Sequence, residues 1–151
     1  MRSFQTIAEL KDLVGQEIGV SDWITVTQER IQLFADATND HQWIHLDAER
    51  AKAGPFGTTI AHGFLTLSLL PEMAASAFGV NETRMGVNYG LNKVRFPAPV
   101  PVDSKVRMRA KVAELEEISG GAQMIMELTF EREGGDKPVC VAQSVVRVYE
   151  G

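Results

Sequence analysis

One helical segment and four long alternating segments set the strongest limits on how this chain can fold. Residues 63–78 place apolar side chains around most of the circumference of a helix, so other parts of the chain must surround it. In the second half of the chain, apolar and polar residues alternate over 85–96, 104–118, 122–132 and 138–149. This alternation is typical of strands with one buried face, and proline or glycine pairs separate the segments.

The four segments are longer than an average strand of about 5–6 residues, so we expect a long, mainly antiparallel sheet that twists and curls. The helix over 63–78 is the long apolar element that can fill the concave side of this sheet. A curved sheet around one central helix is the hotdog fold, so we predict an α+β chain of this class. Pro71 lies inside the helix, and because proline removes a backbone donor we expect a kink or a break there.

The first half of the chain carries shorter elements. A capping-box pattern that begins at Thr6 predicts a short amphipathic helix, and a strand is expected over 18–26. Thr27 can cap a second helix, and Asn39 is a suitable left-handed residue to end it. Asp40 is therefore expected just beyond the end of a helix.

The composition is that of one ordinary domain. The chain has 151 residues, of which 44% are hydrophobic and 23% charged, with no break in composition, so we expect a single domain over 1–151. No stretch approaches the roughly 20 apolar residues of a membrane span, and residues 1–14 lack the layout of a signal peptide. These features predict a cytoplasmic protein. The net charge of −5 argues against nucleic-acid binding, because DNA and RNA are themselves densely negative.

Cysteine and the basic residues offer little reactive chemistry. Cys140, the only cysteine, lies between two valines, and we interpret it as a buried strand residue rather than a nucleophile. Four basic residues alternate with apolar ones inside 104–118, which favours a solvated face. The alternative is that these residues, with Lys93 and Arg95, help to attract a phosphorylated carrier.

One block of the sequence carries a coherent set of reactive groups. It places Asp40 and His45 five residues apart and follows them with His62 and Gly63 at the start of the apolar helix. A carboxylate and an imidazole can hold and deprotonate one water molecule, because histidine titrates near neutral pH and aspartate is ionised there. Gly63 can offer a backbone N–H at a helix N-terminus to a negatively charged oxygen, and its missing side chain permits close approach. These are the parts needed to add water next to a carbonyl group.

The block resembles the MaoC-like (R)-specific enoyl-CoA hydratase family, whose members have a hotdog fold. The family pattern is an Asp, a His, an Asp and an Ala at fixed spacings and then a His-Gly pair, and it is matched by Asp40, His45, Asp47, Ala51, His62 and Gly63. The segments DHQWIH and YGLNKVRFP resemble a narrower bacterial subgroup that includes nodulation-protein-N-like members. The resemblance implies that Asp40 and His45 hold the catalytic water and that the Gly63 amide binds the thioester oxygen.

Three neighbours of the Asp40/His45 pair allow more than one interpretation. His41 is interpreted as a residue with a structural hydrogen bond rather than a second base. His62 is either an anchor between the loop and the helix, which we favour, or a substrate-binding residue. Trp43 either packs in the core or at a subunit interface, or contacts the acyl chain, in which case its bulk and the helix over 63–78 limit the acyl length.

Metal and serine chemistry are not favoured by the sequence. Asp40, His41 and His45 could in principle ligate zinc, but the spacings of structural and hydrolytic zinc sites are missing, so we expect no metal. The Gly-x-Ser-x-Gly pattern of a serine hydrolase is also missing.

The residues and the resemblance together predict reversible hydration of a trans-2-enoyl-CoA to an (R)-3-hydroxyacyl-CoA. No cofactor is expected, because coenzyme A enters as part of the substrate. The alternatives are a dehydratase for 3-hydroxyacyl carrier-protein thioesters, a thioester hydrolase, and a non-catalytic acyl-CoA-binding module, against which the intact pair argues. We also expect a homodimer, because a curved sheet of this size has exposed edges and a single wrapped helix.

Overall fold

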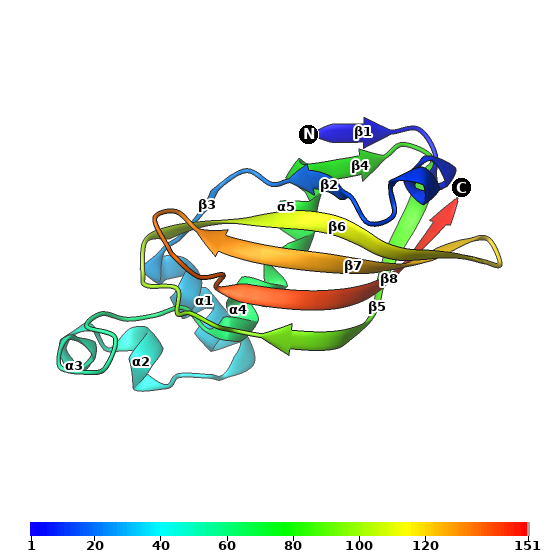
Figure 1. Cartoon of the computed structure of the whole chain (residues 1–151). Helices are drawn as coiled ribbons and strands as arrows, with labels where there is room; N and C mark the ends of the chain where they lie inside the picture. The colour runs from blue at the N-terminus through cyan, green and yellow to red at the C-terminus, as the bar shows by residue number, and fades with distance from the viewer. Residues whose placement is uncertain (151) are drawn as a thin grey trace.

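A long antiparallel sheet forms the body of the chain, whose computed structural model describes residues 1–150 (Figure 1). The strands of this sheet are β2 (Glu17–Val20), β3 (Ile24–Val26), β5 (Thr83–Arg95), β6 (Ser104–Ile118), β7 (Gly121–Arg132) and β8 (Cys140–Glu150). Their order is β2-β6-β7-β8-β5, with β3 also paired to β6, and every pairing is antiparallel. The four long alternating segments of the sequence are therefore strands, as predicted.

The strand predicted over 18–26 is divided into β2 and β3. The chain leaves the ladder at Ser21, whose Oγ accepts the Met108 N–H at 2.8 Å while its own N–H donates to the Met108 carbonyl at 2.9 Å. A side-chain oxygen thus takes the place of a strand carbonyl at this point. The alternation did not reveal the division, because Ile18 and Val26 on either side of it are both fully buried.

The central helix is present in two parts. The helical elements are η1 (Ile7–Leu13, a 3-10 helix), α1 (Gln28–Thr38), α2 (Trp43–Leu46), α3 (Ala48–Lys52), α4 (Gly63–Ser68) and α5 (Leu70–Ala77). The helix predicted over 63–78 forms α4 and α5, which are divided at Leu69. Pro71 lies in the first turn of α5 and cannot donate a hydrogen bond back into α4, so the expected break is confirmed.

A second, very small sheet was not predicted. Phe78, the last residue of the predicted helix, instead begins strand β4 (Phe78–Val80), which pairs in parallel with β1 (Arg2–Phe4). Figure 1 shows this pair along one edge of the molecule, next to β2. Strands of three residues are too short to show a period of two, so the sequence carries no signal for them. The pair fixes the N-terminus against the end of α5.

The concave face of the sheet holds the core. On β6 the fully buried residues alternate along the strand, and they share one apolar cluster with Met73 of α5. These alternating residues are Val106, Met108, Ala110 and Val112. The arrangement of a curved sheet around a helix is the hotdog architecture that the alternation predicted.

The basic residues of β6 lie on the opposite, outer face. Arg107 and Arg109 both bind Glu131 of β7, with Nε–Oε distances of 2.6 and 3.3 Å. Lys111 lies 3.8 Å from the Glu127 carboxylate. The interpretation of a solvated face is confirmed, and its positive charge is largely matched by carboxylates of the neighbouring strand.

Cys140 is fully buried on β8, and burial raises the pKa of its thiol to about 11, so it is a core residue as interpreted. Among the described helices, none combines the length and the apolar character that crossing a bilayer requires.

Strand β5 differs from the other long strands because it lies at an edge of the sheet and pairs only with β8. Its large apolar side chains are exposed to solvent: Met85, Val87, Tyr89 and Leu91. A cavity of about 390 Å³ lies between this strand and the central helices, with Leu67, Ser68, Leu91 and Ser144 among its lining residues. The central helices therefore leave part of the concave face next to β5 uncovered.

Candidate active site

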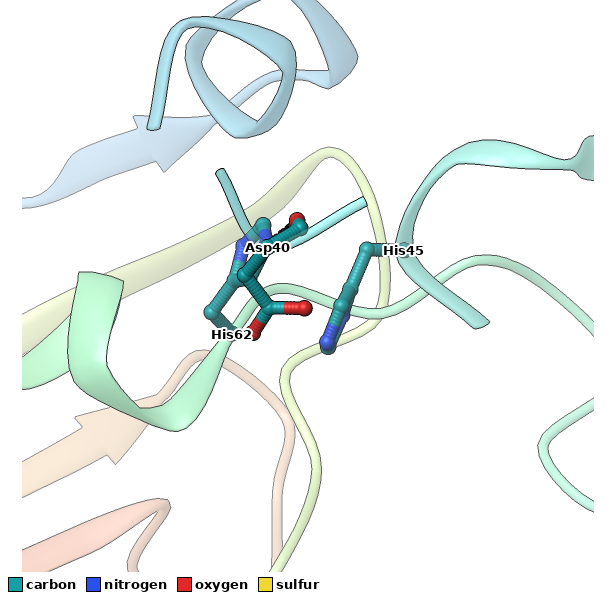
Figure 2. Close-up of side chains that lie close together, drawn as sticks. All are labelled: Asp40, His45 and His62. Atoms are coloured by element: carbon teal, nitrogen blue, oxygen red, sulfur yellow. Dashed lines mark hydrogen bonds between the residues drawn. The ribbon is translucent and has the colours of Figure 1, made fainter. Parts of the chain in front are cut away.

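The segment that carries Asp40 and His45 meets the start of the central helix, which brings Asp40, His45 and His62 together (Figure 2). Asp40 follows α1, His45 lies in α2, and His62 immediately precedes α4. One polar side-chain atom from each residue lies within 4.8 Å of those from the other two. Because each hydrogen bond to a water oxygen spans about 2.7–3.2 Å, this spacing suits one water molecule shared by the side chains.

The position of Asp40 depends on how α1 ends. Thr27 caps the start of α1 by accepting the Arg30 N–H at 3.1 Å, and Asn39 ends the helix in the left-handed conformation with φ of 59°. The Asp40 N–H then donates to the Ala35 carbonyl at 3.1 Å. Asp40 is therefore held by its backbone just beyond the helix, as the sequence predicted, while its carboxylate remains exposed to solvent.

His45 is oriented by a backbone carbonyl. Its ring is buried, and Nδ1 lies 2.7 Å from the Ile60 carbonyl oxygen. Because a carbonyl only accepts hydrogen bonds, Nδ1 must carry the proton. The neutral ring then has its lone pair on Nε2, which is the form of histidine that can take a proton from water.

The backbone around His45 is held from two further directions. The Ile60 N–H donates to the Ile44 carbonyl at 3.0 Å, so the loop before α4 runs along α2. The Gln28 amide donates to the His45 carbonyl at 2.8 Å and accepts a hydrogen bond from Thr59 Oγ1 at 2.7 Å. Sequence reasoning missed Gln28, Thr59 and the Ile60 carbonyl as parts of the site.

Electrostatics favour the neutral form of His45. Burial lowers the pKa of His45 below its usual value, and the neighbouring His62 ring adds to this effect. The Ile60 carbonyl and the Asp40 charge act in the opposite direction, but burial is the largest influence. At neutral pH the ring is therefore available as a base.

His62 contacts both members of the pair. Its Nε2 lies 3.0 Å from the Asp40 backbone carbonyl, and its ring stacks on His45 with centroids 3.8 Å apart and an interplanar angle of 24°. Phe34 packs against the same ring at 4.8 Å. The favoured role of His62 as an anchor between the loop and the helix is consistent with these contacts, and a direct contact with substrate stays a prediction.

The stacked rings do not suit a shared metal ion. An ion bound by both histidines must lie in both ring planes, at about 2.0–2.1 Å from each nitrogen. Two nearly parallel planes at this separation do not meet close to the nitrogens. One nitrogen of each ring is also already committed to a backbone carbonyl.

Gly63 is the first residue of α4, so its N–H is one of the amides that have no partner within the helix. A side chain at this position would crowd Phe96, because a Cβ built on Gly63 would lie 3.1 Å from the ring, so the ring would have to move slightly. An apolar cavity of about 310 Å³ lies beside these residues, and Gly63, Thr66 and Phe96 are among those that line it. The close Phe96 ring therefore favours glycine at this position, while binding of a thioester oxygen by its amide stays a prediction.

Comparison with known proteins shows the family of the chain. Residues 9–132 match the family described as the MaoC like domain. The chain belongs to this family. MaoC-like proteins include hydratases and dehydratases, so the family resemblance predicted from the sequence is confirmed.

Similar proteins cover nearly all of this MaoC-like chain. The 3-hydroxyacyl-thioester dehydratase Z of Mycobacterium tuberculosis is 55% identical over 148 residues, which are 97% of this chain and 98% of that protein. Nodulation protein N of Rhizobium leguminosarum bv. viciae is 49% identical over 142 residues, covering 91% of this chain and 87% of that protein. Among solved structures, the unliganded R-hydratase from Pseudomonas aeruginosa superimposes with a TM-score of 0.71 at 24% identity, covering 91% of this chain and 83% of that chain.

Two neighbours of the pair lie apart from it in the MaoC-like structure. His41 Nε2 lies 2.9 Å from Asp36 Oδ1 on the surface, which agrees with a structural hydrogen bond. A Cβ built on Gly54 would lie 3.2 Å from the Trp43 ring, and the Arg50 guanidinium lies 4.3 Å from the ring centroid. These contacts belong to the α2–α3 segment, so contact between Trp43 and an acyl chain stays a prediction.

Proposed function

We propose that this MaoC-like chain is an enzyme that interconverts trans-2-enoyl-CoA and water with (R)-3-hydroxyacyl-CoA. One observation carries the proposal. The Ile60 carbonyl holds the proton on His45 Nδ1, so that Nε2 is free to accept a proton. The Asp40 carboxylate lies close enough for it and His45 to bind one water molecule together. A base and a carboxylate that share one water are what hydration requires.

In the hydration direction, Asp40 and His45 orient the water and His45 Nε2 accepts one of its protons. The oxygen bonds to C3, the C2–C3 double bond supplies electrons to C2, and negative charge builds on the thioester oxygen. A backbone N–H such as that of Gly63 stabilises this charge. A proton from the Asp40/His45 pair is then delivered to C2, so one water is consumed and no other reagent is needed. Dehydration follows the same steps in reverse.

The similar proteins support this reaction class. The mycobacterial relative at 55% identity is named a 3-hydroxyacyl-thioester dehydratase, and its match spans nearly the full length of both chains. The apolar cavity beside Gly63 offers space for an acyl chain, since its other lining residues include Phe56, Ile60, Val100 and Val139. We propose coenzyme A as the thioester carrier and the cytoplasm as the location, with no metal or other cofactor.

The decisive test is loss of enoyl-thioester absorbance when the purified protein meets crotonyl-CoA. The same acyl group on an acyl-carrier protein distinguishes the two carriers. Coupling to dehydrogenases specific for (R)- or (S)-3-hydroxyacyl-CoA reports the product, and only the (R)-specific enzyme is expected to give a signal. Binding of crotonyl-CoA without turnover would instead favour a non-catalytic module, while release of free coenzyme A would favour a hydrolase.

We propose that the active form is a homodimer in which two copies of β5 face each other. The edge of β5 has unpaired backbone groups, and its exposed apolar side chains, with Tyr89 59% exposed, are unusual for a free strand edge. A second copy would cover both the strand and the open cavity next to it. Light scattering that gives the monomer mass of 16.6 kDa at micromolar concentration would contradict this proposal.

A further inference from the structure

The His62 side chain touches both members of the Asp40/His45 pair. It is 3% exposed and lies between the Asp40 backbone carbonyl, the His45 ring and the Phe34 ring. If its ring turned, it would change both the hydrogen bond to the Asp40 backbone and the stacking contact with His45. Its protonation and hydrogen bonding therefore affect the whole site.

The proton on the His62 ring can be placed from its contacts. Nε2 faces a carbonyl oxygen at 3.0 Å, and because that oxygen only accepts, Nε2 must donate. In the neutral ring, Nδ1 then carries the lone pair. This nitrogen is buried and has no hydrogen-bond partner among residues 1–150. A buried acceptor without a donor is unfavourable, so a donor is expected nearby.

Thr66 carries the complementary group. Its Oγ1 is the other buried side-chain polar atom without a partner in the described chain, and the residue is 1% exposed. His62 is the N-cap of α4, and the Thr66 N–H donates to the His62 carbonyl at 3.2 Å, so the two residues are neighbours at the start of this helix. A threonine hydroxyl can donate, and in helices threonine divides between two χ1 rotamers.

We propose that the Thr66 hydroxyl donates to His62 Nδ1, directly or through one water, and that this Thr66–His62–Asp40 chain positions the catalytic pair. The inference rests on the proposed function, since the pair is catalytic only if that function is correct. His62 and Thr66 act in this proposal as positioning residues. Thr66 also lines the cavity beside Gly63, so the test must separate positioning from contact with the acyl chain. The chain aims the His62 Nε2–H at the Asp40 carbonyl and keeps the ring stacked on His45.

The proposed chain also decides which histidine takes the proton from water. With Nδ1 occupied by a donor and Nε2 already protonated, His62 has no free site for another proton. The groups that face His45 are the Asp40 carboxylate, the His62 ring and the Ile60 carbonyl, with Gln28 on its backbone oxygen. A neutral His62 ring leaves His45 free to become cationic during turnover, whereas a second cation stacked at 3.8 Å would oppose this.

The test compares Thr66→Val, which removes the hydroxyl at nearly constant volume, with Thr66→Ser, which keeps it. One hydrogen bond typically contributes about 1 kcal/mol. If this amount is lost from the activation free energy, Thr66→Val should lower kcat for crotonyl-CoA by roughly fivefold to tenfold with KM unchanged. Thr66→Ser is expected to restore most of that loss. Equal losses in both variants, or a raised KM with unchanged kcat, would assign Thr66 to packing and overturn the proposal.

The imidazole tautomer gives a readout that does not depend on activity. In the ¹⁵N spectrum of the wild-type protein, His62 is expected to show a protonated Nε2 and an unprotonated, hydrogen-bonded Nδ1, and in Thr66→Val the Nδ1 signal is expected to shift. A wild-type spectrum with the proton on Nδ1, or an unchanged Nδ1 signal in Thr66→Val, would refute the hydrogen bond.

The two measurements separate this inference from the proposed function. An inactive wild-type protein that shows the expected tautomer would contradict the hydratase and, with it, the positioning role, while the hydrogen bond would stand. An active protein in which Thr66→Val changes neither kcat nor the spectrum would retain the hydratase and remove the positioning chain.

Discussion

The centre of the sheet and the end of the molecule that carries Asp40 and His45 bury different kinds of side chain. Along the middle of β6 and β7, apolar side chains fill the inside, and the charged side chains of Arg107, Arg109, Glu127 and Glu131 lie on the outer face. At the other end, polar side chains are buried: His45, Thr59, His62 and Thr66. The centre therefore derives its stability from apolar burial, while the site uses hydrogen bonds to place its groups.

The difference lies in what each region can lose. A missing methylene in the centre leaves a cavity, which lowers the free energy of unfolding but leaves distant groups in place. A missing polar atom at the site removes little apolar area, but it changes where protons reside. The two regions should therefore respond differently to mutation, with stability affected in one and turnover in the other.

The largest effect is expected from the catalytic pair. Asp40→Asn and His45→Gln should each lower kcat for crotonyl-CoA by roughly 10²–10⁴, because each removes a group that acts in proton transfer. Binding of the product CoA ester, followed by calorimetry, should change little. The double variant should lose little beyond the worse single variant, because groups that act as a unit are not additive. Turnover like that of the wild type in either single variant would end the proposed mechanism.

The matching change in the centre is Phe130→Ala. Phe130 is fully buried on β7, and removing a buried phenyl ring typically costs about 3–5 kcal/mol of unfolding free energy. Urea unfolding should show this loss, while kcat per folded molecule remains close to that of the wild type. A large fall in kcat at a temperature where the variant is folded would show that the two regions are coupled.

The pH dependence sharpens the comparison at one residue. Because burial lowers the pKa of His45, its base form persists below the usual histidine value of about 6.5, and kcat/KM should fall only at more acidic pH. The free energy of unfolding changes with pH in the same direction and falls as the pH becomes more acidic. The contribution of neutral His45 is fully present above about pH 6.5 and is lost as the pH falls through the lower folded pKa.

Activity and melting temperature measured against pH check both statements. The control is His41→Asn, because His41 pairs with Asp36 on the surface and should leave the acid limb of the rate profile in place. An acid limb above pH 6.5 in the wild type would contradict the neutral base.

Acyl-length preference is expected to change by a smaller factor. Trp43→Ala should raise kcat/KM for longer enoyl-CoAs relative to crotonyl-CoA if bulk beside the pair limits the tail. Phe96→Ala should raise the ratio more, by up to about tenfold, because Phe96 lines the cavity beside Gly63. An unchanged ratio in folded Trp43→Ala would remove Trp43 from the acyl pocket, and an unchanged ratio in Phe96→Ala would place that pocket elsewhere.

The smallest effect is expected on the outer face of the sheet. Lys111→Ala removes an exposed pair with Glu127 whose charged atoms lie 3.8 Å apart. Pairs of this kind contribute about 0–1 kcal/mol, so the urea midpoint should hardly move, and turnover should not change. A decrease in the free energy of unfolding of more than about 1 kcal/mol would mean that the ion pairs of the outer face stabilise the fold.

Most of the fold was predictable because it rests on a repeated local rule. The bounds of β6 follow from alternation, the break before α5 follows from Pro71, and the end of α1 follows from Asn39. The elements that sequence reasoning missed were short or interrupted. Strand β4 has only three residues, and the division after Val20 depends on a Ser21 hydroxyl that inserts into the ladder.

The site was predictable in its residue types but not in its contacts. The spacing of Asp40, His45 and His62 identified the groups that meet, and family resemblance supplied their expected roles. The contacts that orient them come from backbone carbonyls of Asp40 and Ile60. Every residue has such a carbonyl, so no residue type marks the positions where one is used.

The loop that precedes α4 makes the tautomer of His45 insensitive to the side chain at Ile60. Its proton is held by a peptide oxygen at Ile60, which every possible amino acid at that position would also supply. This loop is fastened to the strand connection by Ala61 N–H to the Val100 carbonyl at 2.8 Å and Val102 N–H to the Thr59 carbonyl at 2.9 Å. No single side-chain replacement at Ile60 can delete the acceptor. The carbonyl can be taken away from His45 Nδ1 only by moving the backbone. Insertions or deletions in this loop should therefore disturb the His45 tautomer more than substitutions at Ile60.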